Sequence, residues 1–246
     1  MRLKLTIAYD GQPFLGWQSQ AGGRTVQDAL EAAVSAIEGE RVSVQGAGRT
    51  DAGVHALGQV AHCEVTPRVP LDRWQRAINN ELPPTIRVVR CVKGASDFHA
   101  RFSATGKIYG FRIWNGTYLP PHELGRSWFV PGRFDAEVLQ EAGQLLVGQH
   151  DFAGFTANLK GAKRDTVRTV RSIRVRRRGS LISVDFEGSG FLYKMVRLLT
   201  GSMIRVAQGR ADAGWLKDVL ARRASTHFAG NAEGLYLKRV LYGVRK

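Results

Sequence analysis

The first 92 residues carry an order of strand and helix signals that recurs later in the chain. Alternating apolar residues over 3–9 predict a strand, and apolar residues at helical spacing behind Thr25, a suitable N-cap, predict a helix over 26–37. Residues 42–44 and 60–65 predict two strands, residues 71–82 a helix closed by two prolines, and residues 86–92 a last strand. The order is βαββαβ.

Residues 108–241 repeat this order. The predicted elements are a strand at 108–114, a helix at 138–146 that stops before Gly148, strands at 168–177 and 181–187, helices at 195–206 and 215–220, and a strand at 235–241. Two such units predict an α+β fold of two pseudo-symmetric ferredoxin-like halves, 1–104 and 105–246. Halves of this kind usually join their sheets, so we expect one extended mixed or antiparallel sheet, with helices on one side and a central cleft.

The halves differ between their second and third strands. The first half has the segment GAGRTDAGVHALG at 46–58, with four glycines around one carboxylate, whereas the second half has only the turn 178–180. Glycine allows positive φ and close approach, so Asp51 can stand at the floor of a cleft with Arg49 two residues away. This difference predicts one active site per chain. The alternative is a tight glycine turn in which Asp51 caps its own backbone.

The charge balance indicates a polyanionic partner. The chain has 36 Lys and Arg against 21 Asp and Glu, a net charge of +15 and a pI near 10.5. Nucleic acid is the first candidate, and anionic membrane surfaces are also compatible with this charge. No apolar run is long enough to span a bilayer, and the first seven residues alternate like a strand, unlike a signal peptide. We therefore expect a soluble cytoplasmic protein.

The cysteines and histidines do not predict a metal centre. Cys63 and Cys91 lie in apolar, strand-like surroundings without a Cys-x-x-Cys partner and are expected to be reduced packing residues. The spacing of His55, His62 and His99 fits no zinc template, so structural roles are expected. We expect no metal and no cofactor.

Several motifs in the same order resemble the tRNA pseudouridine synthases of the TruA type. The strongest is GRTDAGVH at 48–55, which matches the signature of that family. The likeness extends along nearly the whole chain, which is more specific than any single motif. The other matching segments are AYDG at 8–11 with FLGWQ at 14–18, RTVQ at 24–27, FHAR at 98–101 running on to Tyr109, MVR at 195–197 with Gly201, and EGLYL at 233–237.

The resemblance implies roles for individual residues. Asp51 would be the catalytic aspartate, Arg197 the arginine that pairs with it, and Tyr109 the active-site tyrosine that stacks on the uracil or helps to remove the proton from C5. Leu235, with Gly234, would pack against the flipped base, and Arg49 would clamp a phosphate or fill the space that the base leaves. From the residues alone, Arg197 could equally project to solvent, and Tyr109 and Leu235 could be ordinary packing residues.

Two kinds of basic segment occur. Arginines on one face of the strand at 168–177 and in its turn point away from Ile173 and Val175, which is typical of a solvated face; they are Arg171, Arg174, Arg176, Arg177 and Arg178. Loop cations are better suited to grip RNA phosphates, which gives affinity with little sequence readout. The predicted RNA contacts are Arg24, Lys160, Lys163, Arg164 and Arg168.

The family resemblance implies an isomerase that converts uridine to pseudouridine at positions 38–40 of the tRNA anticodon arm, as a homodimer. Asp51 would act either as a nucleophile or as a base that removes a ribose proton, and both routes stay open. A glycosidase that releases the base is a rival, although such enzymes usually need two carboxylates and Asp10 is better explained as a turn residue. A catalytically silent RNA-binding module is the alternative from another class.

Overall fold

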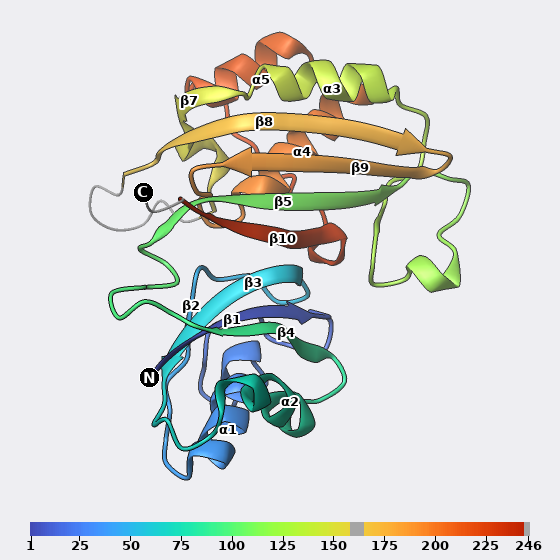
Figure 1. Cartoon of the computed structure of the whole chain (residues 1–246). Helices are drawn as coiled ribbons and strands as arrows, with labels where there is room; N and C mark the ends of the chain where they lie inside the picture. The colour runs from blue at the N-terminus through green and yellow to red at the C-terminus, as the bar shows by residue number, and fades with distance from the viewer. Residues whose placement is uncertain (158–164, 244–246) are drawn as a thin grey trace. The chain divides into compact units, whose positions relative to one another are not determined.

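The computed structural model describes residues 1–157 and 165–243, and these residues divide into two compact units (Figure 1). Unit 1 comprises residues 1–105 together with 236–246, and unit 2 comprises residues 106–235. The α+β class predicted from the sequence is confirmed, because helices and mixed-sheet strands occur in both units.

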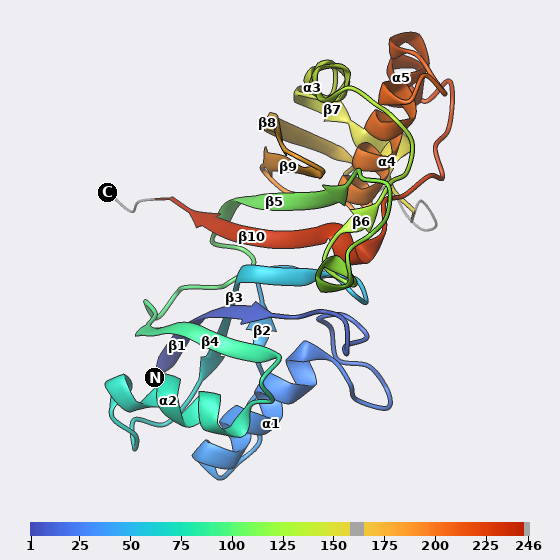
Figure 2. The ribbon, with the colours of Figure 1, turned by 90° about the vertical axis from the view of Figure 1, so that its right-hand side faces the viewer.

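Unit 1 has the strand order of a ferredoxin-like sheet. β1 (Arg2–Tyr9) lies between β4 (Ile86–Lys93) and β3 (His55–Glu64), both antiparallel to it, and β2 (Gln45–Gly46) pairs with the other edge of β3. The helices α1 (Val26–Glu38) and α2 (Leu71–Glu81) lie together on one face of this sheet (Figure 2). That face is apolar because every second residue of β1 points into it, and Leu3, Leu5 and Ile7 are fully buried.

Unit 2 repeats the strand pairing of unit 1, in which the third strand lies between the first and the second. β5 (Ala104–Trp114) pairs with β9 (Leu181–Gly188), and β9 pairs with β8 (Val167–Arg178), all antiparallel. Two short strands extend this sheet, β7 (Gly148–Asp151) on β8 and β6 (Trp128–Phe129) on β5. The helices are α3 (Ala136–Gln144), α4 (Met195–Ala207) and α5 (Ala213–Leu220), with 3-10 turns η1 (Pro121–Glu123), η2 (Phe152–Phe155) and η3 (Ala232–Gly234).

The last strand is grouped differently from the sequence expectation. β10 (Leu235–Tyr242) was expected to close the second half, but from Tyr236 onward it is grouped with unit 1. The reason is a parallel pairing with β3, in which Tyr236 lies opposite His55 and Leu237 opposite Ala56. Unit 1 is therefore built from two stretches of chain that are far apart in sequence.

The strand predicted at 42–44 is wrong, because β2 contains only residues 45 and 46. Val42 and Val44 are buried as the apolar pattern required, but their N–H groups donate to side chains of α1 instead of a strand. Val42 N–H bonds to Ser35 Oγ at 2.9 Å and Val44 N–H to Glu31 Oε1 at 3.0 Å. The predicted N-cap is present: Thr25 accepts a hydrogen bond from the N–H of Asp28, the third helical residue.

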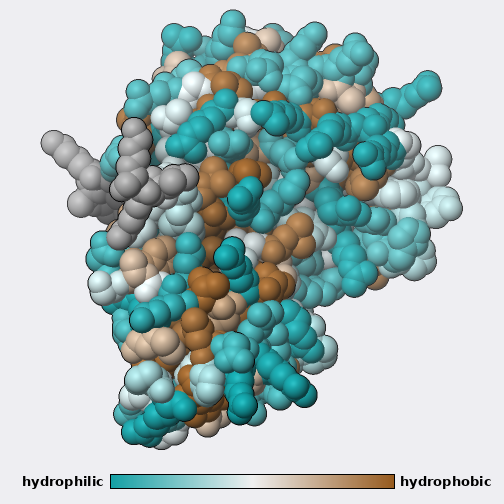
Figure 3. Space-filling view, in the orientation of Figure 1, coloured by the Kyte–Doolittle hydropathy of each residue, from teal (hydrophilic) through white to brown (hydrophobic). Residues whose placement is uncertain are grey.

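Hydrophilic residues cover most of the face shown in Figure 3, with apolar residues in patches between them. In the part of the chain that the structure describes, no helix combines the length and the apolar character that crossing a membrane requires.

Both cysteines are free thiols, and burial raises the pKa of Cys63 to about 12 and that of Cys91 to about 11.

The end of α1 is tied to the end of β3 through a buried carboxylate. Glu38 accepts the N–H of Thr66 at 2.7 Å and also the Thr66 hydroxyl. The hydroxyl bond is the largest cause that holds the pKa of Glu38 below its usual range, although burial opposes it. A depressed folded-state pKa adds stability above the unfolded value, and this stability is lost as the pH falls through the folded-state pKa.

We expect Thr66→Val, which removes the hydroxyl, to lower the free energy of unfolding at pH 7 by about 1–2 kcal/mol. The deficit should shrink as the pH falls below the usual range of a glutamate, because Glu38 becomes protonated in the wild type. Urea unfolding at several pH values measures both effects, and Thr66→Ser serves as the control that keeps the hydroxyl. An equal deficit at every pH would contradict this account.

Candidate active site

The loop between β2 and β3 is fastened to the strand that follows it. Ala47 N–H donates to Val60 O at 2.7 Å, and the side-chain amide of Gln59 donates to Gly48 O at 2.8 Å. Asp51 lies beyond these anchors in a turn that is closed by a bond from Val54 N–H to Asp51 O at 3.1 Å, and its residue is partly exposed. The loop therefore presents the carboxylate from a fixed backbone.

The residue before Asp51 is held on two sides. Thr50 Oγ1 lies 2.9 Å from Tyr9 Oη at the end of β1, and Thr50 O accepts the N–H of Trp17 at 3.1 Å. Tyr9, Trp17 and Thr50 are all buried. Burial raises the pKa of Tyr9, so the phenol stays neutral and can donate to Thr50. The position of Asp51 is thus set by its neighbour in the chain.

Two glycines allow the segment after β1 to approach this loop. A Cβ on Gly11 would lie 2.1 Å from Val54 O, and a Cβ on Gly16 would lie 2.6 Å from Thr50 O. Gly16 also has φ +97°, a conformation that other residues rarely adopt. Any side chain at either place would push the loop away.

Arg49 is exposed and is held at one of its nitrogens. Its Nε donates to Gln18 Oε1 at 3.1 Å, and the amide of Gln18 donates in turn to Gln27 Oε1 at 2.9 Å on α1. The guanidinium is therefore attached to the helix through two glutamine side chains. In the sequence, Gln18 and Gln27 were noted only as parts of matching motifs, and their contact with Arg49 was not predicted. The signal that could have indicated it is the glutamine amide, which can accept one hydrogen bond and donate another.

His55, at the end of the loop, joins three segments. Its Nδ1 accepts the N–H of Gly11 at 3.1 Å and lies 3.3 Å from Asp10 Oδ1. Its ring stacks on Tyr236 of β10, with centroids 4.5 Å apart and planes at 16°. Asp10 also accepts the N–H of Gln12 at 3.0 Å, which agrees with its expected role in a turn. His55 thus has the structural role that was expected for it.

Tyr109 lies in unit 2, in the middle of β5 opposite Phe186 of β9. Only 8% of the residue is exposed, and its ring meets the edge of Phe191, with centroids 5.3 Å apart and planes at 86°. Phe191 follows β9 and was not singled out in the sequence. The rings of Tyr109 and Phe191 are therefore in an edge-on contact, and the Tyr109 phenol is nearly buried.

Arg197 occupies the first turn of α4, whose neighbouring residues Val196 and Leu198 are buried. Its Nε donates to Gly230 O at 2.7 Å, and Gly230 N–H donates back to Arg197 O at 2.9 Å. The segment after Gly230 packs closely against β5, because a Cβ on Gly234 would lie 2.6 Å from the Phe111 ring. These bonds fix the stem of Arg197 against the turn that leads into β10.

Leu235 follows this turn and is 6% exposed, which agrees with a packing residue and leaves its expected contact with the base a prediction. The sequence-predicted residues thus fall into two sets. Asp51, Arg49 and the exposed Arg24 belong to unit 1, whereas Tyr109, Arg197 and the pair Gly234–Leu235 belong to unit 2.

The predicted RNA contacts are spread over the chain. Arg24 has φ 65° and is exposed, with its carbonyl accepting the N–H of Leu15 at 2.9 Å. Arg168 donates to Val167 O at 2.5 Å and reaches Asp165 at 3.4 Å, so part of its charge is already neutralised. Lys160, Lys163 and Arg164 lie outside the described residues.

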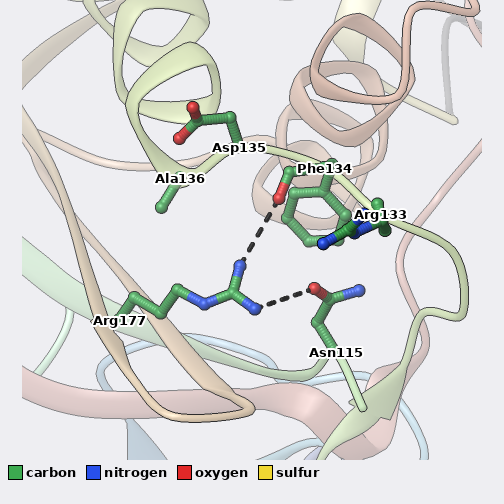
Figure 4. Close-up of a pocket in the computed structure, with 6 residues that line it drawn as sticks. All are labelled: Asn115, Arg133, Phe134, Asp135, Ala136 and Arg177. Atoms are coloured by element: carbon green, nitrogen blue, oxygen red, sulfur yellow. Dashed lines mark hydrogen bonds between the residues drawn. The ribbon is translucent and has the colours of Figure 1, made fainter. Parts of the chain in front are cut away.

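A pocket in unit 2 contains none of the predicted site residues (Figure 4). Arg177, one of the two arginines that line it, donates to Asn115 Oδ1 at 3.2 Å, Phe134 O at 3.4 Å and Gly179 O at 3.0 Å. Arg177 therefore joins the β8–β9 turn to two loops. Among residues 1–157 and 165–243, no group of three or more His, Cys, Asp or Glu side chains is arranged to hold a metal ion.

Comparison with known proteins gives consistent matches. A family profile described as tRNA pseudouridine synthase matches residues 5–103 and 142–243. A protein of Akkermansia muciniphila named tRNA pseudouridine synthase A is 42% identical over 252 residues, covering 98% of this chain and 95% of its own length. A protein of the same name from Rhodospirillum centenum is 42% identical over 244 residues, covering 98% and 99%.

Among solved structures, the chain aligns with a chain of a Cbf5-Nop10-Gar1 complex at a TM-score of 0.41 and 13% identity. The alignment covers 96% of this chain and 49% of that one, a likeness too low to carry an argument.

We expect Gly16→Ala to destabilise the protein more than Gly39→Ala does. Both glycines have positive φ, +97° and +83°, but only Gly16 faces another atom, Thr50 O. Gly39→Ala should therefore cost about 1–2 kcal/mol from backbone strain, and Gly16→Ala about 1–3 kcal/mol more. Urea unfolding measures the difference, and hydrogen exchange at the Trp17 amide reports whether the loop has moved. Equal costs with an unchanged Trp17 amide would contradict the close approach.

Proposed function

The chain belongs to the tRNA pseudouridine synthase family and is an isomerase; from this premise we propose that it converts uridine to pseudouridine at positions 38–40 of the tRNA anticodon stem-loop. The reaction breaks the bond between N1 and C1′, turns the uracil and joins C5 to C1′. The proton on C5 is lost and N1 becomes protonated, so the composition of the nucleotide does not change. No cofactor or energy source is needed for this balance.

The observation that carries the proposal is the fixed loop around Asp51. Thr50 is bonded to Tyr9 and Trp17, and Asp51 follows it on a partly exposed backbone position. A carboxylate in such a place can reach a substrate without rearrangement of the loop, which is what efficient catalysis requires. We propose that Asp51 acts directly on the nucleotide, as a nucleophile at the sugar or as the base that removes a ribose proton.

Arg197 is proposed to pair with Asp51 and to hold its carboxylate ionised and oriented. The support comes from the stem of Arg197, whose Nε is fixed by Gly230 O at 2.7 Å in unit 2. An arginine with a fixed stem presents its terminal nitrogens in a defined plane, which suits a carboxylate.

Tyr109, Gly234 and Leu235 are proposed to receive the base. The uridine must leave its stack at a cost of about a few kcal/mol, and stacking on the Tyr109 ring with packing against Leu235 would offset part of it. Tyr109 is nearly buried beside Phe191, and the tight turn at Gly234 fixes the backbone before Leu235. Arg49, held by Gln18, is proposed to clamp a phosphate or to fill the space of the flipped base.

The remaining parts of the proposal concern the RNA and the assembly. The net charge of +15 favours tRNA as the partner, with phosphate contacts at Arg24, Arg168 and the 160–164 cations. A homodimer that grips one tRNA and a cytoplasmic location complete the proposal.

The direct test is incubation with an unmodified tRNA transcript, followed by mapping of pseudouridine by position. Asp51→Asn should lower the rate by at least about a thousandfold with little change in tRNA affinity, because it removes only the reacting carboxylate. Asp72→Asn, an exposed carboxylate in the first turn of α2, is the matched control and should keep full activity.

Three results would defeat the proposal. Pseudouridine formation by Asp51→Asn would remove the catalytic role of that residue. Release of free uracil would indicate a glycosidase, and tRNA binding without any product in the wild type would indicate a silent RNA-binding module.

We expect Arg197→Lys to lower kcat about 10- to 100-fold while the protein stays folded. Lysine keeps the charge but loses both the bond to Gly230 O and the planar fork that orients a carboxylate. Single-turnover kinetics at saturating tRNA measure this step. Arg205→Lys on the same helix is the control, and an equal loss there would mean that α4, and not the proposed pair, is affected.

A further inference from the structure

The most exposed large apolar side chain in the described part of the chain is Phe102, which is 77% exposed. Exposure of a phenylalanine forgoes the favourable burial of a large apolar surface. Phe102 lies in unit 1, in the turn 99–103 just before β5. The site proposed above does not use it.

The turn that carries Phe102 is rigidly bonded. His99 Nδ1 accepts two backbone N–H groups, that of Arg101 at 3.1 Å and that of Phe102 at 3.2 Å. Ser103 closes the turn, because its N–H donates to His99 O at 2.9 Å and its Oγ accepts His99 N–H at 3.0 Å. The aromatic ring is therefore presented by an ordered backbone.

Two further bonds attach this turn to the sheet of unit 1. Ala100 N–H donates to His62 Nδ1 at 3.2 Å, and Tyr242 Oη donates to Ala100 O at 2.7 Å. Burial, and next the charge of His99, lowers the pKa of His62, which keeps its ring neutral and able to accept. The turn is thus held by β3 and β10, and Phe102 is exposed without being loose.

The surroundings of Phe102 are aromatic and cationic. The His99 ring lies 4.3 Å from the Phe102 ring at 33°, and the Arg101 guanidinium carbon lies 5.7 Å from its centre. A flat π-face beside a cation fits a nucleobase with its phosphate, because bases stack on aromatic rings and phosphates pair with arginine. The Arg101 cation favours RNA over an apolar contact with a second copy, because a phosphate can pair with it.

We propose that Phe102, with His99 and Arg101, is a stacking platform for an unpaired base of the tRNA, apart from the uridine that reacts. The identification of the RNA as tRNA rests on the proposed function. His62, which holds the turn, lies seven residues along β3 from His55 at the end of the Asp51 loop. That separation is about 23 Å along the strand, so the platform is attached to β3 well away from His55.

The test measures tRNA affinity and turnover separately. Phe102→Ala and Phe102→Leu should both raise the Kd for tRNA about 5- to 150-fold, with kcat at saturating tRNA unchanged. Phe102→Trp should bind as tightly as the wild type, because it restores a π-face. None of the bonds described for the turn uses the Phe102 side chain, so these variants should melt at the wild-type temperature.

Two controls separate the platform from general effects. Tyr118→Ala removes another exposed aromatic side chain, 69% exposed and in unit 2, and should leave the Kd unchanged. Arg101→Gln should weaken binding and lower the slope of log Kd against log salt by about one, whereas Phe102→Ala should keep the slope.

An unchanged Kd in Phe102→Ala, or a Kd in Phe102→Leu equal to the wild type, would overturn the platform. A change from dimer to monomer in Phe102→Ala, measured by sedimentation without RNA, would assign the surface to a second copy and overturn it as well. If the wild type forms no pseudouridine but Phe102→Ala still loses tRNA affinity, the proposed function fails and the RNA contact stands.

Discussion

The buried contact between Tyr9 and Thr50 is the constraint on which the candidate site depends. Asp51 is partly exposed, and the backbone that presents its carboxylate is held through the residue before it. Thr50 is bonded to the end of β1 through its hydroxyl and to Trp17 through its carbonyl. The bond to Trp17 requires the chain after β1 to pass close to the loop, and the glycines at positions 11 and 16 permit this approach.

The duplication of the fold explains why one loop can be so elaborate. In unit 2 the equivalent strands β8 and β9 are joined by a tight turn at Gly179, with φ 59°, and Arg177 secures that turn to neighbouring loops. In unit 1 the equivalent strands are separated by the glycine-rich loop. The shared ferredoxin-like scaffold therefore tolerates both connections, because the pairing of the first and third strands holds each sheet independently of the link between the second and third.

Much of the fold could be predicted from the sequence, because apolar periodicity records which face of an element is buried. The alternation at Leu3, Leu5 and Ile7 and the helical spacing behind Thr25 were sufficient for β1 and α1. The same signal failed at Val42 and Val44, since burial does not say whether an N–H donates to a strand or to a helix side chain. β6 and β7, with 2 and 4 residues, are too short for any period to appear.

The candidate site was predictable where a residue type is chemically unusual, and less so where contacts are long-range. Asp51 among glycines is such a case, as is an arginine in the apolar helix α4. The contacts of Tyr9, Gln18 and Phe191 were missed because each joins residues that are distant in the chain.

The parallel pairing of β10 with β3 has a further consequence for biosynthesis. Because Tyr236 stacks on His55, the ribosome must make all of unit 2 before the surroundings of the Asp51 loop are complete, so a nascent chain carries this loop well before its last contact can form.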